Sequence, residues 1–116
     1  MLRIVLQPMV NPYEPYPGSE GIVDVDRFPF VLGRHASCDY QLDQPHISRW
    51  HCSFSVIGTQ VWLRDLESRN GTYINNTKLL APRPVQTGDL ISLGMCLFRV
   101  HVHARLETRS QLAMTP

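Results

Sequence analysis

The sequence predicts an all-β domain built as a two-sheet β-sandwich. Short segments alternate in polarity with period two, which is typical of strands that bury one face. Turn-forming residues separate these segments about every eight to twelve residues, and no long helical pattern occurs before residue 104. With 116 residues, 43% of them hydrophobic and 18% charged, the chain is long enough for one domain with a core and too apolar to be disordered. Many short strands in one small domain fit a sandwich.

The predicted strands follow one another along the chain. Leu2, Ile4 and Leu6 alternate through a first strand over 2–7, which is expected to stop at Pro8. The Pro- and Tyr-rich segment 8–18 is predicted as a long surface loop, because proline fixes φ and lacks an amide donor. Further strands are predicted over 21–25, 28–32, 40–42, 52–56, 60–66, 72–75, 78–80, 90–93 and 96–103. Residues 104–116 are expected to form a tail that frays or a short helix.

The same patterns predict which side chains are buried. Gly58 is expected to turn strand 52–56 into strand 60–66 as a hairpin. The last strand is expected to face Phe98, Val100 and Val102 inward and Arg99, His101 and His103 outward. The core is also expected to hold Trp50, Phe54 and Trp62, with Cys38 and Cys52 buried and inert.

Charge and cysteine content exclude several classes of protein. Eleven Lys and Arg residues against ten Asp and Glu residues leave a net charge of +1, too little to hold nucleic acid or a membrane surface. The apolar runs are far shorter than the ~18 residues that span a bilayer, and no secretory signal is apparent. The three cysteines lack the spacing of a disulfide framework or zinc site, so a reducing cytoplasm is expected. Lys78 is the only lysine, and arginine is the cation whose planar fork matches phosphate.

Three polar segments stand at the ends of predicted strands, where a sandwich places its recognition loops. They are Gly33-Arg34-His35-Ala36-Ser37, His46-Ile47-Ser48-Arg49-Trp50-His51 and Asp65-Leu66-Glu67-Ser68-Arg69-Asn70-Gly71-Thr72. Arg34 suits binding of a phosphate or closure of a surface turn, and Ser48 suits a phosphate donor or a local turn cap. Asn70 suits a clamp on an extended peptide backbone or, with Gly71, a tight turn.

These segments, followed by Gly88-Asp89-Leu90-Ile91-Ser92-Leu93-Gly94, resemble the motifs of the forkhead-associated (FHA) domain family in order, spacing and residue type. The resemblance covers about residues 20–103, and with the first strand it gives an expected domain over 1–103. It implies a sandwich of about eleven strands whose apical loops bind phosphothreonine in a partner protein. The partner would be a substrate of a Ser/Thr protein kinase, and the chain could be one module of a larger polypeptide.

The resemblance also assigns roles to single residues. Arg34, Ser48 and Arg49 are expected to contact the phosphate, and Asn70 the peptide backbone. Arg69 departs from the Ser or Thr that family members often carry beside the site, and either adds a cation or points to solvent. The expected supporting residues are Gly33, His51, Gly71, Thr72 and Asn75. His46 and Arg69, from their places in the loops, are candidates for reading acidic or polar residues that flank the phosphothreonine.

Catalytic and metal-binding interpretations find little support in the sequence. Ser48 and His51 lack a third triad member and an oxyanion-hole segment, so we expect no enzyme activity. His101 and His103 lack a third ligand, so a solvated strand face is expected in place of a metal site, and no cofactor is expected. The alternative to phosphothreonine binding is a phosphate-independent interaction or scaffold domain with the same fold.

Overall fold

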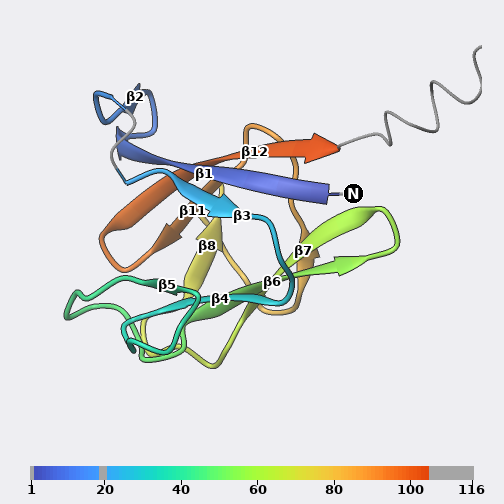
Figure 1. Ribbon diagram of the computed structural model, residues 1–116. Coiled ribbons are helices and arrows are strands. Elements are labelled where there is room, and N and C mark those ends of the chain that lie inside the picture. Colours follow the sequence, from blue (N-terminus) through green and yellow to red (C-terminus); the bar gives the residue numbers. More distant parts are fainter. Residues whose placement is uncertain (1, 19–20, 105–116) are drawn as a thin grey trace, which may run out of the picture.

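The computed structural model describes residues 2–18 and 21–104, and within them it contains twelve strands in two sheets. Figure 1 shows the two sheets stacked face to face, and the described part of the chain contains no helix. The predicted all-β sandwich is therefore confirmed. The strand count exceeds the expected eleven because several edge strands are only two residues long. The predicted tail lies outside the described residues, apart from Ala104 at the end of the last strand.

The larger sheet has seven strands in the order β2-β1-β12-β11-β8-β9, with β3 also paired to β1. Its strands are β1 (Leu2–Asn11), β2 (Glu14–Pro15), β3 (Val23–Val25), β8 (Thr72–Ile74), β9 (Thr77–Lys78), β11 (Leu90–Leu93) and β12 (Cys96–Ala104). β1 and β12 are antiparallel from Leu2 opposite Ala104 to Pro8 opposite Phe98. The two ends of the described chain therefore close the middle of this sheet.

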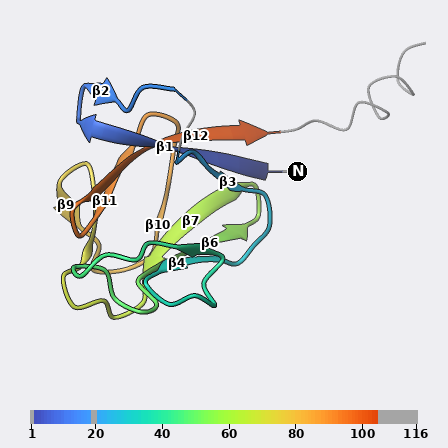
Figure 2. The ribbon, with the colours of Figure 1, turned by 60° about the vertical axis from the view of Figure 1, so that its left-hand side comes forward.

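The smaller sheet has five strands in the order β10-β7-β6-β4-β5. Its strands are β4 (Phe30–Gly33), β5 (Tyr40–Gln41), β6 (Cys52–Ile57), β7 (Gln60–Asp65) and β10 (Arg83–Pro84). β6 and β7 form the predicted hairpin, whose turn contains Gly58 at φ +62°. Figures 1 and 2 show the loops that join β4 to β5, β5 to β6 and β7 to β8 gathered at one end of the sandwich.

The core lies between the sheets and consists of the inward side chains of both. Phe54 from the smaller sheet and Phe98 and Val100 from the larger one are buried, as the alternation predicts. Other buried side chains include Ile4, Leu6, Val25, Leu32, Leu63, Ile74, Ile91 and Leu93. Each large apolar side chain contributes about 1.5–3 kcal/mol when it leaves water. This core holds the strand ends, and thus the loops they carry, in fixed positions.

The prediction that the first strand stops at Pro8 was wrong. β1 continues to Asn11 and turns back into β2, so segment 8–18 contains a hairpin in place of a long loop. Pro8 lacks an amide donor, but its carbonyl accepts a hydrogen bond from the amide of Tyr16 at 3.1 Å. The side-chain oxygen of Asn11 accepts the amide of Tyr13 at 2.8 Å and closes the turn.

Three burial predictions were also wrong. Trp50 is 47% exposed, because it lies in the loop before β6 and the next residue, His51, takes the inward position. Trp62 is only half-buried. Cys38 is half-buried as well, and its thiol donates to the carbonyl oxygen of Arg49 at 3.1 Å. Cys52 is buried as predicted, and burial raises the pKa of its thiol to about 12.

Candidate functional site

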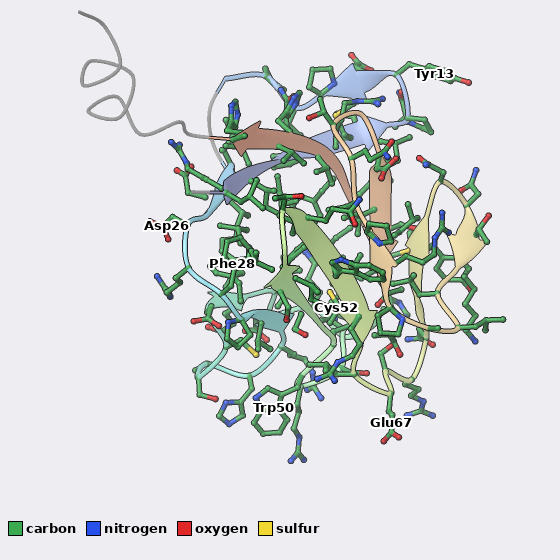
Figure 3. The ribbon with its side chains drawn as sticks, turned by 90° about the vertical axis from the view of Figure 1, so that its right-hand side faces the viewer. Tyr13, Asp26, Phe28, Trp50, Cys52 and Glu67 are labelled. Carbon is green, nitrogen blue, oxygen red and sulfur yellow. The ribbon has the colours of Figure 1, made fainter. Side chains whose placement is uncertain are left out.

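The three polar segments meet at one end of the sandwich and are joined by backbone hydrogen bonds. The amide of Arg34 donates to the carbonyl of Ser48 at 2.9 Å, and the amide of His35 donates to the carbonyl of Arg49 at 3.1 Å. The third segment joins through the amide of Arg69, which donates to the hydroxyl of Ser48 at 2.9 Å. In Figure 3 the labelled side chains Trp50 and Glu67 mark this end of the molecule.

The three segments enclose a small hollow with a volume of about 90 Å³. Its lining residues are Arg34, Pro45, His46, Ile47, Ser48, Arg69 and Asn70. Sequence reasoning named five of these seven and missed Pro45 and Ile47. The buried side chain of Ile47 anchors the loop in the core, and the available signal was an aliphatic residue inside a polar segment. Arg49 adjoins the hollow in sequence but does not line it.

Arg34 is held at its inner end and free at its outer end. Its Nε donates to the carbonyl of Ile47 at 3.0 Å, while its two terminal nitrogens have no partner among residues 2–18 and 21–104. A guanidinium held in this way presents its remaining N–H groups as a fork, which is the geometry that binds phosphate or carboxylate oxygens.

Gly33 explains why a glycine precedes this arginine. A Cβ at position 33 would lie 2.1 Å from the carbonyl oxygen of Arg49 and 2.9 Å from the sulfur of Cys38. No side chain fits there, so only glycine lets the segment of Arg34 pack against the loop that carries Ser48. Gly33 thus permits the close contact between the two backbone segments, and this contact positions the side chain of Arg34.

Ser48 is oriented so that its hydroxyl proton remains available. Its oxygen accepts the amide of Arg69, which uses one acceptor position and leaves the O–H donor unused by that bond. The guanidinium groups of Arg49 and Arg69 are exposed, and the ion pairs found in the described part of the chain involve only Arg3 and Arg27. Among the described residues, Ser48 therefore shares the hollow with two arginines that have no carboxylate partner, Arg34 and Arg69, and Arg49 follows it in sequence.

Asn70 closes the hollow on the side of His46. Its amide nitrogen donates to the carbonyl of His46 at 3.0 Å. The second N–H and the side-chain oxygen have no partner in the described ranges, so Asn70 keeps one donor and one acceptor for a ligand. One donor and one acceptor on the same group match the N–H and C=O of an extended peptide.

His51 lies beneath the loops and is completely buried. Its Nδ1 accepts the amide of Ser48 at 3.1 Å, so Nδ1 carries no proton and Nε2–H donates to the carbonyl of Gly71 at 2.9 Å. The ring therefore ties the second segment to the third. Because it binds the amide of Ser48 and not the hydroxyl, the pair is not arranged as a nucleophile and its base.

The third segment is folded around Asp65. This carboxylate accepts hydrogen bonds from the amide and hydroxyl of Ser68 and from the hydroxyl of Thr72, and the hydroxyl of Ser68 also accepts the amide of Gly71 at 2.9 Å. Burial alone would raise the pKa of Asp65, but the hydrogen bonds from Ser68 and Thr72 outweigh it and lower the pKa. Sequence reasoning missed Ser68 as a supporting residue, and its place in the Asp-Leu-x-Ser run was the available signal.

Asn75 lies apart from the hollow. It has a φ of +50° in the turn between β8 and β9, and its side-chain oxygen accepts the amide of Leu90 at 2.9 Å. Its amide nitrogen donates to Asp89 at 3.1 Å. The Asn75 side chain thus joins the β8–β9 turn to the start of β11 and does not touch the recognition loops directly.

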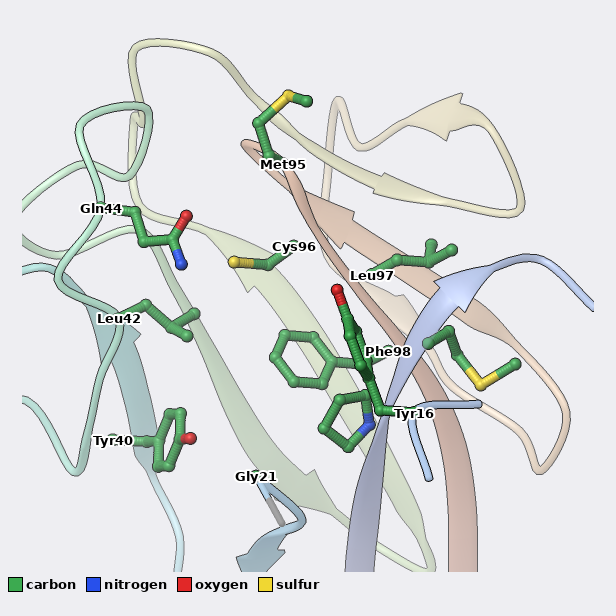
Figure 4. Close-up of a pocket in the computed structure, with 11 residues that line it drawn as sticks. Tyr16, Gly21, Tyr40, Leu42, Gln44, Met95, Cys96, Leu97 and Phe98 are labelled. Carbon is green, nitrogen blue, oxygen red and sulfur yellow. The ribbon is translucent and has the colours of Figure 1, made fainter. Parts of the chain in front are cut away.

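A larger cavity of about 420 Å³ opens on the side of the sandwich, between the start of β12 and the end of β5. Figure 4 shows it lined by Tyr16, Tyr40, Leu42, Met95 and Phe98 among others, and none of its eleven lining residues is charged. It contains no residue predicted for the site.

Within the described residues no group of three His, Cys, Asp or Glu side chains could hold a metal ion.

The sequence model of the FHA domain family matches residues 30–94, which span the three polar segments and the motif over 88–94. The chain belongs to the FHA domain family. Among curated proteins, this FHA domain is 36% identical over 87 residues to the DNA damage response protein kinase DUN1 of Saccharomyces cerevisiae, covering 67% of this chain and 17% of that protein. It is 39% identical over 64 residues to the oxoglutarate dehydrogenase inhibitor of Corynebacterium glutamicum, covering 55% of this chain and 44% of that protein. The chain thus spans less than half the length of these relatives.

Solved structures agree with the sequence relatives. An FHA domain studied for phosphothreonine-dependent interactions superposes with a TM-score of 0.74 at 26% identity, over 89% of this chain and 99% of that one. Mycobacterium tuberculosis EmbR in complex with a low-affinity phosphopeptide shares the fold, with a TM-score of 0.76 at 21% identity over 90% of this chain and 26% of that one.

In residues 2–18 and 21–104 no helix is long and apolar enough to cross a membrane.

Proposed function

We propose that this FHA domain binds phosphothreonine-containing segments of partner proteins that are substrates of a Ser/Thr protein kinase. The observation that carries the proposal is the hollow lined by the free end of Arg34, the hydroxyl of Ser48 and Arg69, whose guanidinium has no carboxylate partner among the described residues. A phosphothreonine carries about −1.5 to −2 charges and three acceptor oxygens, so it needs several donors fixed in advance. The solved FHA domain with phosphothreonine-dependent interactions supports the same conclusion.

The proposed roles follow from the donors each residue has left. Arg34 binds the phosphate as a fork, Ser48 donates its hydroxyl, and Arg49 and Arg69 supply further positive charge at the rim. Asn70 binds the peptide backbone through its remaining N–H and oxygen. His46 lines the hollow beside Asn70 and is placed to meet a residue that flanks the phosphothreonine.

We further infer that this domain works by binding alone. The buried, fully hydrogen-bonded His51 supports this inference, because it leaves Ser48 without a base. We take the domain to extend over 1–103, since β1 and β12 pair in the middle of the larger sheet. The three free cysteines support a reducing compartment such as the cytoplasm.

The test compares two peptides that differ only in phosphorylation of one threonine. Isothermal titration calorimetry should show binding of the phosphothreonine peptide and none of its unphosphorylated counterpart, because the proposed contacts are to phosphate oxygens. The Arg34→Ala variant should lose at least about tenfold in affinity. Its melting temperature should stay close to that of the wild type, since the exposed side chain makes a single hydrogen bond within the described residues.

The control variant is Arg83→Ala, which removes an exposed arginine on β10 outside the hollow and should leave binding unchanged. Equal binding of both peptides would contradict the proposal and favour the phosphate-independent interaction domain. A large fall in the melting temperature of Arg34→Ala would show that the arginine is structural.

A further inference from the structure

An aromatic pair stands exposed beside the hollow. The indole of Trp50 stacks on the imidazole of His35, with ring centroids 4.9 Å apart and planes inclined by 18°. Figure 3 shows Trp50 projecting from the loop end of the molecule, away from the sheets. The side chain is 47% exposed, and since the imidazole covers one face, this exposure lies on the other face and the ring edge. We call Trp50 and His35 the aromatic platform.

The platform is held in place by hydrogen bonds. Nδ1 of His35 accepts the amide of Ser37 at 3.0 Å and contacts the hydroxyl of Ser37 at 2.7 Å, so the ring cannot rotate freely. The backbone of His35 is fixed by the bond from its amide to the carbonyl of Arg49. The imidazole on which Trp50 stacks is therefore held in place before a ligand binds, which lowers the entropy cost of stacking on the indole.

Stability of the fold does not account for this exposed tryptophan. Trp50 is absent from the core, and the adjacent inward position is filled by His51. Large aromatic side chains at a binding surface are among the residues that most often carry binding energy, because they bury much apolar area with few rotatable bonds.

The platform adjoins the proposed phosphate site along both of its segments. His35 follows Arg34, and Trp50 follows Arg49, so the Cα atom of each platform residue lies about 3.8 Å from that of one of these two arginines. An extended peptide advances about 3.3 Å per residue. A side chain a few residues from the phosphothreonine is therefore expected to reach the indole.

The surrounding charge selects the chemistry of that side chain. Arg34, Arg49 and Arg69 have no carboxylate partner in the part of the chain that the structure describes, so they disfavour a lysine or arginine on the indole. An acidic side chain would pair with those arginines and would leave the apolar ring exposed to water. An uncharged apolar side chain is the occupant that gains from the ring without charge repulsion.

We propose that the aromatic platform reads an uncharged apolar side chain close to the phosphothreonine of the bound segment. This inference rests on the proposed phosphothreonine binding and deepens it, since it makes Trp50 a specificity-determining residue. The ligand class is then a phosphopeptide with an aliphatic residue, proline or aromatic residue at one flanking position.

The test is a set of phosphothreonine peptides in which each flanking position is set in turn to Leu, Gly, Asp or Lys. Wild-type protein should prefer Leu over Gly by about tenfold at one position, and Trp50→Ala should abolish that preference while still binding the Gly peptide. Trp50→Phe should retain part of it. His35→Ala should weaken it, because the indole loses its support. Tyr13→Ala, which removes a 92% exposed aromatic on the β1–β2 turn, should change nothing.

A second measurement does not depend on any variant being folded. Binding of the preferred Leu peptide to wild-type protein should shift the tryptophan emission, to which Trp50 and Trp62 both contribute, to shorter wavelength, whereas the Gly peptide should not. Identical position profiles for wild type and Trp50→Ala, with phosphopeptide binding intact, would overturn the platform alone. Failure of wild-type protein to bind any phosphopeptide would overturn the proposed function and the platform with it.

Discussion

At the scale of single residues, the recognition end depends on groups that never touch a ligand. His51 and Asp65 are each surrounded by hydrogen bonds that join two loop segments or the two ends of one loop. Gly33 acts by having no side chain at all. The ligand-facing donors of Arg34 and Ser48 are positioned by these neighbours, so binding can fail through residues that lie behind the hollow.

Gly33→Ala is expected to damage both stability and binding. The new methyl group would lie 2.1 Å from a backbone oxygen, and that oxygen cannot move aside as a flexible side chain would. We expect a loss of about 3 kcal/mol in the free energy of unfolding, measured by urea denaturation, and loss of phosphopeptide affinity.

Gly58→Ala is the matched control for this substitution. Gly58 has a φ of +62°, and a methyl group added there would meet nothing within 4 Å, so alanine costs only backbone strain, about 1 kcal/mol. Equal destabilisation by the two substitutions would show that the close approach at Gly33 is easily relaxed.

The site residues that could be predicted from the sequence are those that belong to motifs of adjacent residues. Gly33-Arg34 and Asn70-Gly71 are recognisable as pairs, and the structure brings Arg34, Ser48 and Asn70 to one hollow. Ser68 was missed because its importance arises from a bond to Asp65 three residues earlier. Asn75 was expected to support the site, but its partners, Asp89 and Leu90, belong to a distant motif that only the folded sheet brings near.

At the scale of elements, strands with regular alternation were predictable and edge strands were not. The β6–β7 hairpin follows from alternation and a central glycine. β10 contains Pro84, which in the sequence indicates a turn, since proline is excluded from central strands but tolerated at a sheet edge, where β10 pairs with β7. Alternation of polarity predicts which face of a strand is buried but not which strands pair with it. The pairing of edge strands can therefore be known only from the tertiary structure.

β1 is expected to be essential although the family match begins at residue 30. Ile4 and Leu6 are buried in the core, and β1 pairs with β12, β3 and β2. Removal of residues 1–22 would expose the inner face of β12 and leave its edge unpaired. We expect the shortened chain to lose its cooperative thermal transition in circular dichroism, and a transition near that of the full chain would contradict this role.

At the scale of the whole molecule, a net charge of +1 conceals an uneven distribution. Arg3 pairs with Asp24 at 2.7 Å and Arg27 with Asp39 at 3.2 Å, both outside the hollow. The arginines of the recognition end have no such partners among the residues that the structure describes. The charge available to a ligand is therefore local, and it acts over about one Debye length of roughly 10 Å in 0.1 M salt.

This distribution leads to an expected dependence of binding on salt. Raising sodium chloride from about 50 mM to about 500 mM should weaken phosphopeptide binding by about tenfold, because exposed arginines are screened while the buried hydrogen-bonded frame is not. Arg69→Ala should bind more weakly at low salt and show a smaller salt dependence, since it removes one exposed cation from the rim. Arg83→Ala should keep the wild-type dependence, because its charge lies outside the hollow. Calorimetry across the salt series measures all three, and an affinity that does not change with salt would show that neutral hydrogen bonds, and not the unpaired arginines, hold the ligand.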